Sequence, residues 1–277
     1  MELPERVVIK GAGDLASGVA HRLYQCGFKI AMLELPQPMV VRKTVAFAAA
    51  VYQGETEVEG VRACLVKAGE EPAGYWEEGV IPVYVDPTGQ LIGQLSPQVV
   101  IDAIIAKRNT GTKRSDAPVV IGLGPGFTAP QDVHAVVETK RGHALGKVIY
   151  DGAALPNTGV PGHIGGYGAE RVLRAPVDGI FQAQRSIGEL VQAGETVALV
   201  SGVPVVANID GMVRGMLFSP LNVEQGMKVG DIDPRGEAAN CHTISDKARA
   251  IGGGVLEAML RLWNKVQESE VRSQEPG

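Results

Sequence analysis

The sequence predicts an α/β protein in which a Rossmann-like parallel sheet is followed by a small β domain and a C-terminal helix. A short β-branched strand near the N-terminus leads directly into a glycine-rich turn and a helical pattern. Further along, one motif recurs after 32 residues, and an apolar stripe at helical spacing follows it. The predicted boundaries are 1–170 for a nucleotide-binding domain, 171–236 for the repeat, and 237–277 for a helix that packs back on the first domain.

Composition indicates an ordinary globular chain. Its 277 residues are 45% hydrophobic and 21% charged, which suits a packed core. The formal charge of -5 gives no indication of a nucleic-acid or membrane-surface partner. No apolar run approaches the roughly 18 to 20 residues that a membrane span needs, so we expect a cytoplasmic protein. The cysteines are odd in number and widely spaced, which argues against a disulfide framework.

The first element, from Arg6 to Lys10, reads as a strand, and the next six residues have the spacing G-x-G-x-x-G/A. Gly11 permits a tight turn, Gly13 lets the backbone approach a pyrophosphate, and the small Ala16 lets the helix pack closely on the strand. The N-terminus of that helix presents free N–H groups to an anion. The stretch therefore predicts a phosphate-binding loop from Gly11 to Gly18, which includes Ser17.

Two acidic residues modify this prediction. Glu34 ends a second apolar strand 21 residues after Gly13, where a carboxylate can accept hydrogen bonds from a ribose. An acid there disfavours a 2′-phosphate, so an NAD-like ligand is favoured over an NADP-like one. Asp14 opposes phosphate binding by its charge, although at the start of a helix it can also serve as a cap.

A second glycine turn, Gly122 to Phe127, follows another apolar strand. The carboxyl ends of strands are where open α/β sheets bind ligands. Arg42, Lys43 and Arg141 are either anion contacts or solvated surface charges. The candidate cofactor-binding residues are Gly11, Gly13, Asp14, Ala16, Ser17, Glu34, Gly122, Gly124 and Gly126.

The histidines show no compact metal-ligand spacing such as HExxH, so no metal site is predicted. His134, His143 and His163 can frame a ligand or can be ordinary surface residues. Cys241 stands beside His242, but adjacent residues rarely face one another, so an activated thiol is not favoured. The roles of all these residues stay open.

The repeat has the form A-x-x-D-G, a hydrophobic run, and V-x-x-G-x-x-V, which indicates a two-fold β structure. It resembles biotinyl and lipoyl carrier domains, which are barrel-sandwich hybrids. In those carriers a lysine on the central hairpin holds the cofactor, and the matching hairpin here is about Ser201 to Pro204. No lysine occurs between Lys147 and Lys228, so the carrier chemistry is excluded. The apolar stripe from Ile251 to Val266 predicts the closing helix.

Several long motifs carry a resemblance to one family. The chain resembles the accessory-protein family of the selenium-dependent molybdenum hydroxylase system (YqeB-type), and its N-terminal part is loosely similar to the maturation factors of xanthine dehydrogenase. This resemblance implies a molybdopterin-dinucleotide-like ligand, a molybdenum hydroxylase subunit as partner and a selenium-linked setting. The motifs are "VIKGAGDLASGVAHRL", "DAIIAKRNTGT", "VIGLGPGFTAPQDVHAVVETKRGHALG", "NTGVPG", "DIDPR" and "ISDKARAIGGGVLEA".

These observations lead to three functional hypotheses. The favoured one is an accessory or maturation protein that binds a nucleotide or a molybdopterin-dinucleotide-like cofactor through its glycine loops. The alternatives are an NAD-dependent oxidoreductase, with His134 or His143 near the reacting carbon, and a noncatalytic protein that docks a hydroxylase subunit. No spacing assigns an acid, a base and a substrate anchor, so binding is favoured over catalysis. Homo-oligomerisation is left open.

Overall fold

The computed structural model describes residues 3–67, 69–159 and 162–274, and within these ranges a nine-stranded sheet is the largest element. The strands run in the order β10-β9-β7-β6-β1-β2-β5-β4-β3. Neighbours are parallel in the centre, whereas the outermost pairs, β3 with β4 and β9 with β10, are antiparallel. The bounds are β1 (Arg6–Lys10), β2 (Lys29–Glu34), β3 (Glu55–Val58), β4 (Val61–Leu65), β5 (Val80–Val85), β6 (Val99–Asp102), β7 (Val119–Leu123), β9 (Ala135–Val137) and β10 (Val148–Ile149).

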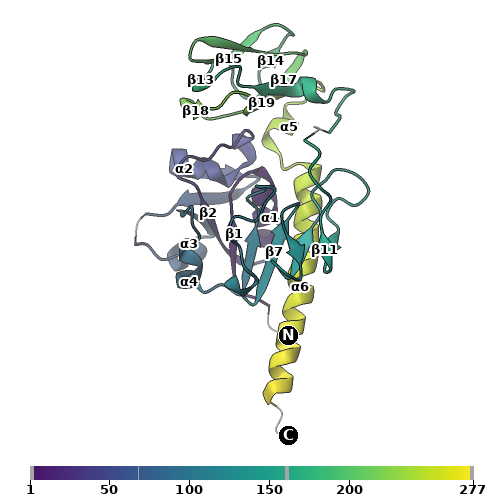
Figure 1. The fold of residues 1–277 in the computed structure, drawn as a ribbon. Coiled ribbons are helices and arrows are strands. Elements are labelled where there is room, and N and C mark those ends of the chain that lie inside the picture. The colour runs from purple at the N-terminus through teal and green to yellow at the C-terminus, as the bar shows by residue number, and fades with distance from the viewer. Residues whose placement is uncertain (1–2, 68, 160–161, 275–277) are drawn as a thin grey trace.

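Both faces of this sheet are covered by helices, which explains why its strands read as continuous apolar runs. On β1, Val7 and Ile9 pack in the same core as α1 (Asp14–Gln25) and α6 (Asp246–Gln274). Val8, between them, packs in the core of the opposite face, with residues of α3 (Ala73–Glu77) and α4 (Leu91–Leu95). Figure 1 shows α6 running along the sheet and past its end toward the C-terminus.

Helices α1 and α6 run parallel to one another in close contact. A Cβ atom on Gly18 would lie 2.6 Å from the Cβ of Ala248, and one on Gly252 would lie 3.2 Å from the Cβ of Arg22. The contacts advance in the same direction along both helices, so their N-termini lie at the same end. The hydroxyl of Ser245 caps α6 by accepting the N–H of Ala248 at 3.2 Å.

The β-rich second part of the described chain contains two four-stranded antiparallel sheets, with the orders β12-β19-β17-β14 and β16-β15-β13-β18. The 32-residue repeat corresponds to pairs of strands, and the members of each pair lie in different sheets. One core, built around Phe181, Val213 and Met216, is shared by both sheets. The bounds are β12 (Val172–Arg174), β13 (Gly179–Ala183), β14 (Leu190–Val191), β15 (Thr196–Val200), β16 (Val203–Val206), β17 (Gly211–Met216), β18 (Leu221–Val223) and β19 (Lys228–Asp233).

Short elements connect these parts. Figure 1 shows α5 between the antiparallel sheets and the start of α6. The remaining bounds are α2 (Ala50–Gln53), α5 (Ala239–His242), the paired strands β8 (Thr128–Ala129) and β11 (Gly152–Ala153), and 3₁₀ turns at Lys43–Val45, Phe47–Ala49, Arg114–Asp116 and Ala169–Arg171. Across the described ranges, no helix combines the length and apolar character that a membrane crossing would need.

The topology corrects the predicted fold class. A Rossmann-like parallel sheet followed by a barrel-sandwich hybrid is wrong, because the large sheet is mixed and the rest of the strands form several separate antiparallel sheets. The hairpin at Glu59–Gly60 and the return of the chain at Val148 add an antiparallel strand at each edge. The G-x-G-x-x-G/A spacing and the 32-residue repeat indicate local turns. Neither pattern shows which strands pair at the edges of a sheet.

Candidate functional site

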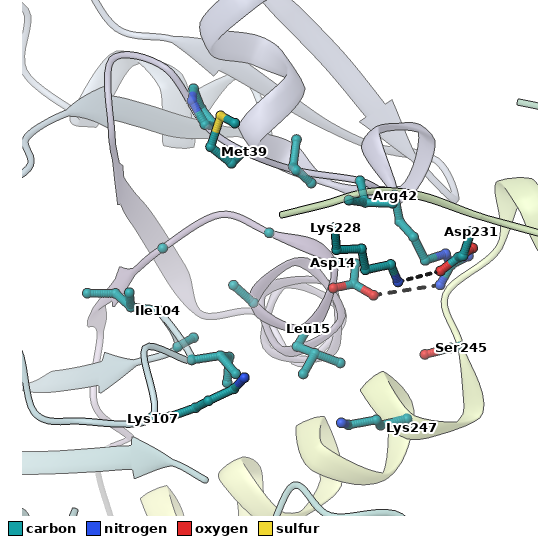
Figure 2. A pocket seen from close by; sticks show the side chains of 18 of the residues that line it. Asp14, Leu15, Met39, Arg42, Ile104, Lys107, Lys228, Asp231, Ser245 and Lys247 are labelled. Atoms are coloured by element: carbon teal, nitrogen blue, oxygen red, sulfur yellow. Dashed lines mark hydrogen bonds and ion pairs between the residues drawn. The ribbon is translucent and has the colours of Figure 1, made fainter. Parts of the chain in front are cut away.

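A pocket of about 770 Å³ lies between the large sheet and the antiparallel sheets. Its walls come from the carboxyl ends of β1 and β2, the loop after β6, the first turn of α1 and the start of α6. Strands β12, β17 and β19 of the antiparallel part complete it, and Figure 2 shows the converging side chains. The pocket therefore occupies the edge at which open α/β sheets bind ligands.

The wall of this pocket is strongly cationic. Nine basic and four acidic residues are found among the described residues that line it. In the whole chain the balance is reversed, with 26 basic and 31 acidic residues. The nine are Lys10, Arg42, Lys107, Arg141, Arg171, Arg174, Arg214, Lys228 and Lys247, and the four are Asp14, Glu34, Asp86 and Asp231. Positive charge is thus concentrated at this one place.

The first glycine loop forms part of the pocket wall. Gly11 has a φ of +90°, and a Cβ there would lie 3.1 Å from the carbonyl oxygen of Ala103. Gly13 is the N-cap of α1, makes no side-chain cap, and has no described atom within 4 Å of where its Cβ would be. The first N–H groups of an uncapped helix have no intrahelical acceptor. Gly13 therefore leaves an open approach to these donors.

Ser17 fixes this loop from behind. Its side chain is fully buried, and its hydroxyl donates to the carbonyl of Ala12 at 3.1 Å and accepts the N–H of Phe47 at 2.7 Å. Ala16 is also fully buried, although it borders the pocket. Of these two predicted cofactor contacts, only Ala16 belongs to the pocket lining, and Ser17 acts on the shape of the loop.

Glu34 lines the pocket at the predicted position, but its oxygens already bind backbone. One carboxylate oxygen accepts the N–H of Ala12 and the other accepts the N–H of Leu35, each at 2.7 Å. Burial raises the pKa of Glu34 above its ordinary value, and the two N–H donors oppose that rise. The carboxylate therefore holds the glycine loop against the end of β2.

Asp14 lies 3.8 Å from Arg42, as Figure 2 shows, and this ion pair offsets part of its charge. Arg42 is buried and donates to the carbonyls of Asn240 and Thr243 at 2.9 and 3.1 Å. Nearby, burial lowers the pKa of Lys247, whose side-chain ammonium group has no hydrogen-bond acceptor among the described residues. Arg42 and Lys247 thus place positive charge beside the N-terminus of α1.

The second glycine turn lies outside the pocket lining. A Cβ on Gly122 would lie 2.5 Å from the ring of Phe127, and one on Gly124 would lie 2.5 Å from the hydroxyl of Thr139. A Cβ on Gly126 would lie 2.6 Å from the backbone of Arg108. These glycines permit close packing of neighbouring segments and do not contact a ligand in this pocket.

Gly126 nevertheless supports the pocket indirectly. The segment it packs against follows β6 and contains Ile105 and Lys107, with φ values of 60° and 62°. Left-handed backbone is unfavourable for a β-branched residue such as isoleucine, and such strain often accompanies functional sites. The segment brings Lys107 to the pocket, where it has no ion-pair partner among the described residues.

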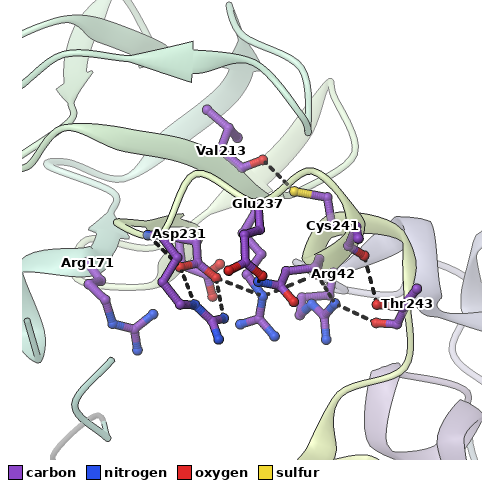
Figure 3. Close-up of polar contacts among 12 residues, drawn as sticks. Arg42, Arg171, Val213, Asp231, Glu237, Cys241 and Thr243 are labelled. Atoms are coloured by element: carbon purple, nitrogen blue, oxygen red, sulfur yellow. Dashed lines mark hydrogen bonds and ion pairs between the residues drawn. The ribbon is translucent and has the colours of Figure 1, made fainter. Parts of the chain in front are cut away.

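The histidines and Cys241 do not line the pocket. The Nδ1 of His134 accepts the N–H of Val120 at 2.9 Å, and burial lowers its pKa. His143 and His163 are exposed. Cys241 is buried, its thiol donates to the carbonyl of Val213 at 3.7 Å, and burial raises its pKa (Figure 3). Within the described ranges, no group of histidine, cysteine and acidic residues is arranged to hold a metal.

Sequence reasoning missed a group of charged residues from the antiparallel part, namely Arg171, Arg214, Lys228 and Asp231. Lys228 donates to Asp231 at 2.7 Å. One signal was present in the sequence, since Arg214 interrupts the apolar strand "GMVRGM", whereas its counterpart one repeat earlier is Gln182. A charge in a buried strand requires a partner or a ligand.

These features define an α/β protein with a cation-lined pocket between a mixed sheet and an antiparallel β part. The chain is 55% identical, over 259 residues, to the uncharacterised protein YqeB of Escherichia coli K12. That match covers 94% of this chain and 48% of the relative, so the chain spans about half the length of the curated relative it matches. The YqeB-type resemblance is confirmed at the level of sequence, and the accessory role stays a prediction. No family model matches the chain.

Solved structures give only distant likenesses. A diketoreductase is 20% identical, with 50% of this chain and 51% of that chain covered and a TM-score of 0.29. An aspartoacylase family protein of Mesorhizobium loti is 12% identical, with 83% and 85% covered and a TM-score of 0.27. A succinylglutamate desuccinylase/aspartoacylase of Rhodobacter sphaeroides is 15% identical, with 83% and 85% covered and a TM-score of 0.26. Scores this low support no inference about the chemistry of the chain.

Proposed function

We propose that this chain binds a nucleotide or dinucleotide ligand, NAD-like or molybdopterin-dinucleotide-like, in the cation-lined pocket, and that it acts as an accessory or maturation protein for a molybdenum hydroxylase. The observation that carries the ligand class is the excess of basic over acidic residues in this pocket, set against a chain that is acidic as a whole. The open approach at Gly13 to the N-terminus of α1 adds backbone donors for a phosphate.

The size and the apolar part of the lining favour a ligand larger than a simple anion. A volume of about 770 Å³ lies within the range of roughly 300 to 1,000 Å³ common for small-molecule sites. Leu15, Met39 and Ile104 line it as well, and Figure 2 shows Met39 and Ile104 on the side of the pocket away from Lys247. An aromatic base or a pterin can pack against such side chains while its phosphates meet the cations.

Binding is favoured over hydride transfer as the activity of this site. A dehydrogenase needs an acid or base near the reacting carbon. His134 and His143, the candidates from the sequence, lie outside the lining. The molybdenum hydroxylase setting, and a hydroxylase subunit as partner, rest on the family resemblance of the sequence.

Isothermal titration calorimetry with NAD, NADP, ATP and a pterin nucleotide tests this function. At least one of them should bind the purified protein and raise its melting temperature. Gly13→Val should abolish binding, because it fills the open approach at a residue whose φ of -66° suits valine. Gly93→Val is the matched control, since Gly93 is exposed, uncrowded and outside the lining. The proposal is wrong if no nucleotide binds, or if both variants behave like the wild type.

A further inference from the structure

Three buried arginines converge on the pocket from segments that are far apart in the sequence. Arg42, Arg171 and Arg214 are 6%, 6% and 9% exposed, yet all three line the pocket. Figure 3 shows the guanidinium groups of Arg42 and Arg171 directed to the same side of the cluster. Burial and the nearby charge of Arg214 lower the pKa of both Arg42 and Arg171, so Arg214 repels each of the other two cations.

The donors of these arginines are only partly used. The Nε atoms of Arg42 and Arg171 are buried without a partner among the described residues. Arg171 donates through one terminal nitrogen to the carbonyl of Gly162 at 3.1 Å. Arg214 donates through Nε to the carbonyl of Asn240 at 3.4 Å, and no described residue accepts from its terminal nitrogens. By contrast, Arg141 forms a two-bond pair with the carboxylate of Asp246, at 2.7 and 3.0 Å.

The positive charge of the cluster formed by these arginines and their charged neighbours is also incompletely balanced. Arg42, Arg171, Arg214, Lys228 and Arg235 are set against four carboxylates, Asp14, Asp231, Asp233 and Glu237, so positive charge is in excess. Buried charges are costly unless they are paired, and buried ion pairs are often no better for stability than apolar residues of similar size. Folding alone therefore gives no reason to hold three arginines here, whereas an anionic ligand does.

A second source of positive potential adjoins the cluster. The parallel helices α1 and α6 both begin at the pocket, where Asp14 and Leu15 belong to α1 and Lys247 to α6. Each helix N-terminus carries the positive end of a macrodipole. The Nη1 atom of Arg42 lies 3.8 Å from the carboxylate of Asp14, so the arginine cluster and the N-terminus of α1 are immediate neighbours.

We propose that Arg42, Arg171, Arg214 and Lys228 form a second anion subsite, beside the one at the helix N-termini, and that the pocket takes a ligand with two linked phosphoryl groups. One phosphoryl group binds the first-turn N–H groups of α1, and the next binds the arginines, whose planar forks match phosphate oxygens. This inference rests on the proposed function, because it concerns the same pocket, and it narrows the ligand to the diphosphate class. A phosphoryl group at the arginines offsets the excess of positive charge in the cluster.

Titration calorimetry with inorganic pyrophosphate and inorganic phosphate, on the full chain, tests the subsite. Pyrophosphate should bind much more tightly than phosphate. Arg171→Met and Arg214→Met should each weaken pyrophosphate binding about 10- to 100-fold, the effect expected for losing hydrogen bonds to a charged group. Arg185→Met is the matched control, because Arg185 is exposed on the antiparallel part, pairs with Glu189 and Glu195, and lies outside the pocket lining. Melting temperatures establish that each variant is folded.

Arg171→Lys distinguishes the loss of a phosphate contact from a general disruption of the structure around residue 171. It keeps the charge but removes the fork, so pyrophosphate binding should fall while phosphate binding changes little. If a nucleotide binds and Gly13→Val abolishes its binding, but the arginine variants bind it normally, the second subsite is wrong and the proposed function stands. If pyrophosphate binding depends on the arginines while no nucleotide binds, the subsite stands and the proposed function is wrong. Equal affinities for phosphate and pyrophosphate overturn the second subsite.

Discussion

At the end of β2, the carboxylate of Glu34 holds the glycine loop through two backbone hydrogen bonds, and this role has a consequence for pH. Burial raises its pKa in the folded protein above the ordinary value of 4.5. Its protonated form is therefore favoured by folding, so its contribution to stability is complete below pH 4.5 and is lost as the pH rises through the folded value.

Glu34→Gln tests whether the stabilisation that Glu34 contributes falls as the pH rises. Glutamine stays uncharged, so the free energy of unfolding of the wild type, minus that of the variant, should decrease as the pH rises from about 4 to 7. Urea unfolding at a series of pH values measures the difference. Glu224→Gln, at an exposed glutamate, controls for the loss of one acidic charge. A difference that stays constant or grows with pH would contradict the assignment.

Asp246, at the start of α6, titrates in the opposite sense. The hydrogen bonds from Arg141 lower its pKa from 3.8 to about 2. Its ion pair therefore contributes above pH 3.8 and is lost as the pH falls through about 2. Carboxyl-carbon NMR titration should find this low midpoint in the wild type, and Arg141→Gln should return it toward 3.8. A midpoint that does not move in the variant would show that Arg141 is not the cause.

Among the elements, the contact between α1 and α6 depends on the absence of side chains. Gly18→Ala would place a methyl group 2.6 Å from the Cβ of Ala248, and overpacking of this kind costs about 1 to 3 kcal/mol. Gly253→Ala changes the same residue type on α6, where no described atom lies within 4 Å, and should stabilise the helix by up to about 1 kcal/mol. Chemical denaturation should give opposite signs for the two variants. Two changes of the same sign would mean that helix propensity outweighs the packing contact.

Local elements of the fold follow from the sequence, and the arrangement of the sheets does not. The strand at Arg6–Lys10, the helix after Gly13 and the strand ending at Glu34 agree with their predicted positions, because β-branched runs and glycine turns act over a few residues. The antiparallel edge strands β3 and β10 were missed. They are short, and their direction depends on pairing with strands elsewhere in the chain.

In the candidate site, too, the local features could be predicted from the sequence and the contacts between distant segments could not. The G-x-G-x-x-G/A motif and the acid at the end of the second strand mark the carboxyl ends of β1 and β2, which are neighbours in the sheet. The residues at these strand ends therefore line the pocket, as predicted: Gly11, Gly13, Asp14, Ala16 and Glu34. Gly122, Gly124 and Gly126 have the same composition but pack against neighbouring segments. The sequence marks Arg214 as a charge in an apolar strand, but it does not show that Arg171 and Arg214 approach Arg42, because that depends on how the antiparallel part packs against the sheet.

For the whole molecule, a diphosphate ligand should join the two parts that form the pocket. Hydrogen exchange measured with and without pyrophosphate should show added protection both in the first turn of α1 and in β17 and β19. Helix α4, which lies outside the lining, is the internal control and should be unchanged. Protection confined to α1 would show that the ligand contacts only the large-sheet side.

The order in which the pocket residues occur along the chain bears on when the site can form. Its lining begins at Lys10 and ends at Lys247, and it draws on most of the sequence between them. During synthesis a ribosome therefore exposes the glycine loop long before α6, which packs against α1, has been made. A chain that has been synthesised only as far as the antiparallel sheets lacks Lys247 and so has only part of the cationic wall. The pocket that the proposed ligand requires is therefore complete only once α6 has packed against α1.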